Sequence, residues 1–135
     1  MKKIQPVVLG VLRNKNRYLL TKRNDRLHHY HGKWQLPGGG LDFGESLEDC
    51  VRREMREELA LAIEEVRLIP QIYHRVYKDE WHGVLISFLH EFTMEPAKII
   101  LNEEASEYGW FTIEEAQQLD SFPYVVEYIQ EAQKI

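Results

Sequence analysis

The segment that decides the fold is GGLDFGESLEDCVRREMREELAL, at residues 39–61. Pro37 and the three glycines after it break the chain sharply, and Ser46 then has the character of a helix N-cap. Apolar residues follow at the spacing of one helical face. They are Leu47, Cys50, Val51, Met55 and Leu59. We therefore predict an amphipathic helix that starts after Ser46 and packs this stripe against a core.

Three carboxylates lie together on another face of the predicted helix. Glu54, Glu57 and Glu58 span an arc of only about 100° around the helix axis. Such a cluster is most often a solvated face with neighbouring arginines as partners. It also offers the hard oxygen ligands that Mg²⁺ or Mn²⁺ prefer, and the glycines upstream would let a backbone carbonyl approach the same ion.

Outward from this segment, the pattern predicts strands before and after the helix. Alternating or continuous apolar runs separated by turn residues predict strands at residues 5–13, 17–23, 63–77 (broken near Pro70), 81–92 and 106–111. Thr112 with Glu115 predicts a short helix to about Leu119, and Ser121 with Pro123 predicts the start of a C-terminal helix. This order predicts an α/β (α+β) fold with a mixed β-sheet sandwiched between α-helices.

The chain length, net charge and cysteine count restrict which fold classes and functions this sequence can have. The chain has 135 residues, of which 44% are hydrophobic and 29% charged, so we predict a single globular domain over residues 1–135. The net charge of −5 argues against broad nucleic-acid binding. The single cysteine excludes an internal disulfide and a cysteine-rich zinc site.

The compartment is also predicted from the sequence. No apolar run approaches the roughly 20 residues of a membrane helix. Lys2 and Lys3 precede an apolar stretch that is too short for a signal peptide and has no cleavage site after it. We therefore expect a cytoplasmic protein without a membrane partner.

The spacing of residues 39–61 resembles the Nudix box, Gly-x5-Glu-x7-Arg-Glu-U-x-Glu-Glu-x-Gly-U, in which U is aliphatic. Gly39, Glu45 and Arg53 match its first fixed positions, and Glu54, Glu57 and Glu58 match its metal-binding carboxylates. Ala60 stands where the family usually has glycine. If its φ is positive, alanine there should cost about 1 kcal/mol, but no ligand is lost. The WQLPGG segment at residues 34–39 and EYGWF at 107–111 also resemble the family.

The resemblance implies a Nudix fold and hydrolysis of a pyrophosphate bond in a nucleoside diphosphate linked to another group, with Mg²⁺ or Mn²⁺ as cofactor. It implies that Glu58 binds metal directly, Glu57 directly or through water, and Glu54 as a ligand or general base. Gly38 would offer its carbonyl, and Arg53 with Glu45 would orient the catalytic loop. Among Glu103, Glu104 and Glu107 in the late loop, we rank Glu104 first as a further base or ligand.

The substrate within this class stays open. In this family a residue downstream of the box sometimes marks the substrate class. At position 76 this chain has Val and lacks such a marker, and Tyr77 lies sixteen residues after Leu61, out of register with another. The short chain most resembles nucleoside triphosphate pyrophosphatases, so we expect a small nucleotide, NTP or dNTP, converted to NMP and pyrophosphate. Dinucleoside polyphosphates and nucleotide sugars, including ADP-ribose, are the alternative, and a non-catalytic nucleotide sensor is another. The family often forms homodimers, and we expect one here.

Other residues with chemical potential have simpler explanations. His28, His29 and His31 could bind zinc or contact a substrate, but a polar loop is the more common arrangement. Cys50 lies on the apolar stripe and is predicted to be a core residue. Six aromatic residues are candidates for base stacking, although most should belong to the core. They are Trp34, Tyr73, Tyr77, Trp81, Trp110 and Phe111.

Overall fold

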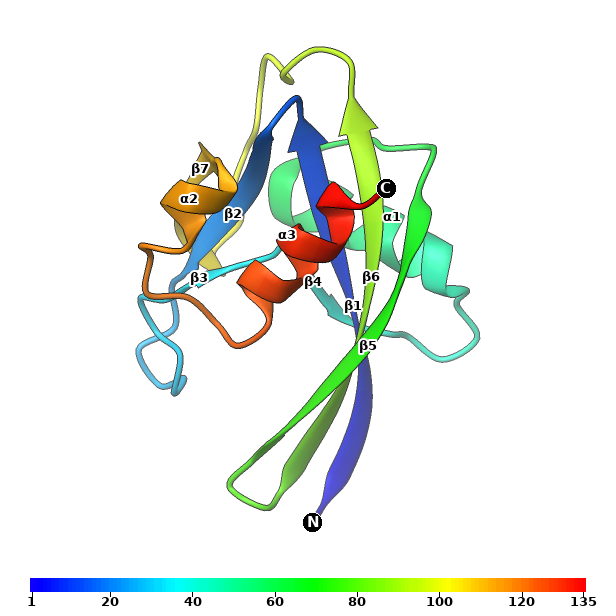
Figure 1. The fold of residues 1–135 in the computed structure, drawn as a ribbon. Coiled ribbons are helices and arrows are strands. Elements are labelled where there is room, and N and C mark those ends of the chain that lie inside the picture. The colour runs from blue at the N-terminus through cyan, green and yellow to red at the C-terminus, as the bar shows by residue number, and fades with distance from the viewer.

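One mixed sheet organises the computed structural model, which describes residues 1–135 (Figure 1). Its seven strands are β1 (Lys3–Asn14), β2 (Arg17–Arg23), β3 (Trp34–Gln35), β4 (Gly38–Gly40), β5 (Arg67–Tyr77), β6 (Trp81–Phe92) and β7 (Ala105–Phe111). The main path runs β3-β2-β1-β6-β5, while β4 pairs with β1 and β7 with β2. The pairing of β1 with β6 is parallel and the others are antiparallel, which confirms the predicted mixed sheet.

Helices cover both faces of the sheet, as predicted. The long helix α1 (Leu47–Leu59) packs on one face, whereas α2 (Ile113–Ala116) and α3 (Val125–Gln133) lie on the other. Successive residues of β1 point to opposite faces. Val7 and Val11 join the cluster under α3, while Val8 and Leu12 join the cluster under α1. The two hydrophobic cores therefore share the central strands.

Helix α1 forms as its sequence predicts. Ser46 is the N-cap, and its side chain accepts a hydrogen bond from the Asp49 backbone N–H at 3.0 Å. Four of the five residues of the predicted apolar stripe are buried, including Cys50, while Leu47 is partly buried at the start of the helix. At its C-terminal end Ala60 adopts the left-handed conformation, with φ 56° and ψ 36°. The positive φ anticipated at this position is therefore present, although the residue is not glycine.

Three predicted boundaries were wrong. Strand β5 begins at Arg67 and not at Ile63, and a register shift between Ile69 and Tyr73 accompanies Pro70. Helix α2 ends at Ala116, with only turn structure up to Leu119. Helix α3 begins at Val125, after a turn at Pro123 and Tyr124 in which Tyr124 has φ 75°. No helix combines the length and apolarity needed to cross a lipid bilayer.

Candidate active site

Arg53 links the glycine-rich loop to helix α1. Its Nε and Nη2 donate to the two carboxylate oxygens of Glu45, at 2.7 and 3.1 Å, and Nη2 also donates to the Gly40 carbonyl at 3.1 Å. Glu45 additionally accepts a hydrogen bond from the Asp42 backbone N–H. These bonds, above all those from Arg53, lower the pKa of Glu45 from 4.5 to about 2. The pair that the motif predicted is therefore formed, and it holds the loop against the helix.

Two of the predicted ligands, Glu54 and Glu58, are buried side by side on α1. Each residue is 8% exposed. Burial is the main cause that raises the pKa of both carboxyls, and the Glu54 charge raises that of Glu58 further. Arg53 Nη1 donates to Glu54 at 3.0 Å, but Glu58 Oε2 is buried without a hydrogen-bond partner. The site thus contains an acidic oxygen that the chain itself does not satisfy.

The glycines of β4 allow this close arrangement. A Cβ on Gly39 would lie 2.7–2.9 Å from the carboxylate atoms of Glu54, which is too short for a non-bonded contact. A Cβ on Gly38 would lie 2.2 Å from the Val8 carbonyl oxygen. Only glycine therefore lets the backbone of β4 pass directly beside the Glu54 carboxylate while β4 stays paired with β1.

Glu57 lies apart from this buried pair. Its side chain is 56% exposed and accepts a hydrogen bond from Arg53 Nη1 at 3.1 Å. No three histidine, cysteine, aspartate or glutamate side chains lie close enough to enclose an ion by themselves. The structure therefore gathers Glu54 and Glu58, and leaves Glu57 at the rim of the site.

The late loop brings Glu104 to the same place. Its charge raises the pKa of both Glu54 and Glu58. The Asn102 backbone N–H donates to the Glu58 carbonyl at 3.3 Å, and the Asn24 N–H donates to the Glu104 carbonyl at 2.8 Å. These bonds fix the loop between α1 and the segment after β2. By contrast, Glu107 lies on β7 and pairs with Lys22.

The oxygen atoms of Glu54 and Glu58 are suitable ligands for the divalent cation that the motif implies. Buried carboxylates that lack enough cationic partners are costly unless they are protonated or bind a metal. Arg53 partly neutralises Glu54, whereas Glu58 has no cationic partner within 4.0 Å among the ion pairs of the chain. Glu58, Glu54 and the adjacent Gly38 backbone would hold an ion of the hard, oxygen-preferring kind.

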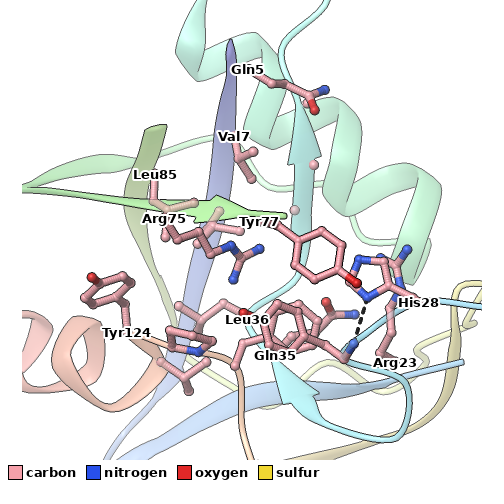
Figure 2. A pocket seen from close by; sticks show the side chains of 18 of the residues that line it. Gln5, Val7, Arg23, His28, Gln35, Leu36, Arg75, Tyr77, Leu85 and Tyr124 are labelled. Atoms are coloured by element: carbon pink, nitrogen blue, oxygen red, sulfur yellow. Dashed lines mark hydrogen bonds between the residues drawn. The ribbon is translucent and has the colours of Figure 1, made fainter. Parts of the chain in front are cut away.

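A cavity of about 430 Å³ opens beside these carboxylates (Figure 2). Glu54, Glu104 and the backbone of Gly38–Gly40 line one part of it. Aliphatic and amide side chains and His28 line other parts of it, together with arginine and aromatic side chains from distant segments. The arginine and aromatic residues are Arg23, Tyr30, Arg75, Tyr77, Trp81, Phe122 and Tyr124. Its volume is typical of small-molecule sites. The cavity therefore has an acidic part and a basic, aromatic part.

Sequence reasoning found only some of these residues. Tyr77 and Trp81 were among the six aromatic candidates, but Arg75 and Phe122 were missed. Arg75 lies two residues from Tyr73 and two from Tyr77 along β5. The two-residue period of a strand therefore predicts that these three side chains share one face of the sheet. Phe122 lies next to a bridge between Trp34 and Ser121, a long-range pairing that no local pattern reveals.

The three loop histidines mainly organise their own loop. His28 Nδ1 accepts from the Tyr30 backbone N–H, and His31 Nδ1 accepts from the Asp25 N–H, each at 3.0 Å. The ring of His29 lies 5.1 Å from that of Tyr77. His28 alone lines the cavity. A polar loop is thus the arrangement observed, and the three imidazoles do not form a metal cluster.

Comparisons with a family model, with sequence relatives and with solved structures agree on one family. A family model described as the NUDIX domain matches residues 3–130. The nucleoside triphosphatase NudI of Escherichia fergusonii is 29% identical over 121 residues, which cover 84% of this chain and 86% of that protein. The MutT protein from Methanosarcina mazei Go1 superposes with a TM-score of 0.84 at 24% identity, covering 98% of this chain and 95% of that one. The NUDIX domain of Shewanella oneidensis NrtR, solved with ADP ribose, gives 0.81 at 22%, covering 99% and 89%. Because the family model spans nearly the whole chain, and because the motif at residues 39–61 has the arrangement described above, this chain belongs to the Nudix hydrolase family.

Proposed function

We propose that this protein hydrolyses nucleoside triphosphates, NTP or dNTP, to NMP and pyrophosphate with Mg²⁺ or Mn²⁺. The relatives named nucleoside triphosphatase NudI support the substrate class, since they match 84% of the chain. The cavity supports it as well, because carboxylates for a metal and aromatic side chains for a nucleobase line the same space. The observation that carries the proposal is the buried, unpartnered Oε2 of Glu58.

Each residue of the motif has a proposed role. Glu58 and Glu54 would hold the cation, with Glu57 joining through water from its exposed position. A bound divalent cation would supply positive charge for the substrate phosphates and lower the pKa of a coordinated water. The Gly38 backbone would complete the ligand set on the β4 side.

The remaining proposed roles concern the proton and the loop. Glu104 stands close enough to influence both buried carboxyls and would accept the proton of the attacking water. Arg53 and Glu45 would keep β4 and α1 in register through their paired hydrogen bonds. Catalysis of this kind rests on positioning and charge neutralisation, so rigid support of the carboxylates should control the rate.

The test is hydrolysis of a panel of NTPs and dNTPs in Mg²⁺, with pyrophosphate and monophosphate identified as products. We expect turnover that EDTA abolishes. Glu58→Gln should lower kcat by about 10²-fold or more, which is the scale for removing one preorganised charge from a reacting centre. Glu95→Gln, at an exposed carboxylate outside the cavity, is the matched control and should leave kcat unchanged.

Other products would redirect the proposal. Turnover confined to dinucleoside polyphosphates or nucleotide sugars would place the enzyme in another substrate class of the same family. Tight binding of a nucleotide with no hydrolysis of any member of the panel would favour a sensing module. Full activity in EDTA, or an active Glu58→Gln variant, would refute the assigned chemistry.

Two further predictions concern the assembly and its location. The expected homodimer would appear as a doubled mass in light scattering at micromolar concentration. The expected cytoplasmic location can be tested by fractionation of the host cell.

A further inference from the structure

Arg75 occupies an aromatic cage inside the cavity. Its guanidinium carbon lies 5.2 Å from the ring centroid of Phe122, 5.3 Å from that of Tyr30 and 5.5 Å from that of Trp81. Figure 2 shows the guanidinium directed into the midst of the labelled side chains. Cation–π contacts of this kind hold the charged group among the three rings. Aromatic rings offer no lone-pair acceptor, so whether the N–H donors of Arg75 find a conventional hydrogen-bond partner depends on the other groups around them.

Those donors have no acceptor within the chain. Arg75 Nε is buried without a hydrogen-bond partner. Burial lowers the pKa of Arg75, and the titratable groups that act on it are Tyr30, Arg23 and Tyr124, none of which is a carboxylate. The two terminal nitrogens are not among the buried unpartnered atoms, so they remain open to the cavity that Arg75 lines. A half-buried, fixed guanidinium with free terminal donors is arranged to receive acceptors from a ligand.

The position within the cavity indicates which part of a nucleotide reaches Arg75. If the proposed cation holds the phosphates near Glu54 and Glu104, the distal part of the ligand would extend between the aromatic side chains that also line the cavity. Aromatic walls suit a planar ring and give little compensation to a hydrated phosphate. The ligand group beside Arg75 is therefore a nucleobase.

From these observations, and on the basis of the proposed nucleotide hydrolysis, we infer that Arg75 is a specificity-determining residue that selects a base with two adjacent hydrogen-bond acceptors on one edge. The fork of a guanidinium matches such an edge with two parallel hydrogen bonds. Guanine offers O6 and N7, and cytosine offers O2 and N3. Adenine, thymine and uracil offer no adjacent pair, since a donor stands next to each acceptor on their pairing edges.

The first experiment measures kcat/KM of the wild-type protein for dGTP, dCTP, dATP and dTTP in Mg²⁺. We expect dGTP or dCTP to exceed both dATP and dTTP by about tenfold or more, the usual discrimination of one bidentate arginine–base pair. The panel also distinguishes guanine from cytosine as the selected base. Equal values for all four nucleotides, or a preference for dATP or dTTP, would overturn the inference.

A pair of variants separates base recognition from neutralisation of a phosphate. Arg75→Lys keeps the charge and loses the planar fork, whereas Arg75→Met loses both. If Arg75 selects the base, both variants should lose the preference. If Arg75 only neutralises phosphate, Arg75→Lys should keep the wild-type values and Arg75→Met should lower kcat/KM equally for all four nucleotides, which contradicts the inference.

Single-atom analogues test the contact on the unaltered protein. Replacing one ring acceptor with C–H, as in 7-deaza-dGTP for guanine or 3-deaza-dCTP for cytosine, should lower kcat/KM about tenfold for the wild type and leave the Arg75→Met value unchanged. An equal effect on both proteins would refute the contact.

A binding measurement keeps this inference separate from the proposed function. Calorimetry with dGMP, dCMP, dAMP and dTMP in the absence of metal should show the same order of affinity, and Arg75→Met should remove it. If the protein hydrolyses no nucleotide but shows this order, the proposed function fails and the role of Arg75 stands. If it hydrolyses nucleotides but binds the four monophosphates equally, the role of Arg75 fails alone.

Discussion

Replacing Ala60 with glycine should stabilise the protein, because Ala60 ends helix α1 in the left-handed conformation. Its φ is 56° and its ψ is 36°, a region in which a Cβ is crowded by the neighbouring carbonyl oxygen. The conformation is imposed by hydrogen bonds at the helix end, from Ala60 N–H to the Arg56 carbonyl and from Leu61 N–H to the Met55 carbonyl. Glycine can keep both bonds without the steric penalty.

The size of the effect follows from two opposing contributions. Relief of the left-handed alanine is worth about 1–2 kcal/mol, while the greater freedom of glycine in the unfolded chain removes about 0.4–1 kcal/mol. The midpoints of these two ranges leave a net gain in the free energy of unfolding of about 0.8 kcal/mol. For a chain of 135 residues, the usual unfolding entropy converts this gain to a rise in Tm of about 2–4 °C.

The assay is reversible thermal or urea unfolding of the wild type and Ala60→Gly. Arg56→Gly is the matched control, because the same glycine placed at an exposed position inside α1 should destabilise by about 1 kcal/mol. Ala60→Gly should leave kcat unchanged, since Ala60 supplies no side-chain ligand. A Tm that stays constant or falls in Ala60→Gly, with Arg56→Gly behaving as expected, would refute the assigned strain.

Three further predictions concern the carboxylates. Glu45 has its pKa lowered from 4.5 to about 2, so its stabilising contribution is present above pH 4.5 and is lost as the pH falls towards 2. Glu45→Gln should therefore be less stable than the wild type at pH 7, by about 1 kcal/mol, the scale of a solvent-screened ion pair, and the gap in urea unfolding should narrow below pH 4.5; a constant gap would contradict this. Glu54 and Glu58 have raised pKa values, so the metal-free protein should lose stability as these buried carboxyls ionise with rising pH. Mg²⁺ must replace their protons, and the rise in Tm that it causes should be larger at pH 8 than at pH 5.5 and should nearly vanish in Glu58→Gln. Gly39→Ala would place a Cβ within 3 Å of the Glu54 carboxylate, which can swing away without unfolding the protein. We expect kcat to fall by about 10²-fold, the scale of a 1 Å misplacement, with little change in Tm; a normal kcat would show that Glu54 has no fixed position to lose.

The local part of this structure could be predicted from the sequence. Helix α1, its Ser46 cap and its buried stripe depend on spacing within one helical segment, and the contact between Glu45 and Arg53 depends on a motif only nine residues long. The strands flanking this segment were also recognisable, because alternating apolar residues of β1 and β2 face the two cores. Short-range periodicity was sufficient in each of these cases.

The cavity could not be predicted in the same way. Tyr30, Arg75 and Phe122 come from a loop, a strand and the segment before α3, and only the tertiary fold brings them together. The start of α3 was missed for a similar reason: Tyr124 takes an unusual φ of 75° while its ring stacks on Tyr73, with 4.4 Å between ring centroids. Helical spacing placed Glu57 beside Glu54, but the exposure of Glu57 depends on what covers each part of α1.

The Arg53 network also sets a length limit on the chain. One guanidinium contacts the carbonyl of Gly40 and the carboxylate of Glu45 at the same time, so the four residues between them form a closed loop of fixed span. An inserted or deleted residue there would pull either Gly40 or Glu45 away from the Arg53 guanidinium. It would also shift Glu54, which is bonded to another nitrogen of the same guanidinium. Phe43, whose side chain points fully into solvent, can change its chemistry freely. This loop should therefore tolerate substitution at Phe43 but almost no change in residue number, while Asp42, which pairs with Arg53, and Gly44, with φ 81°, are constrained in residue type as well.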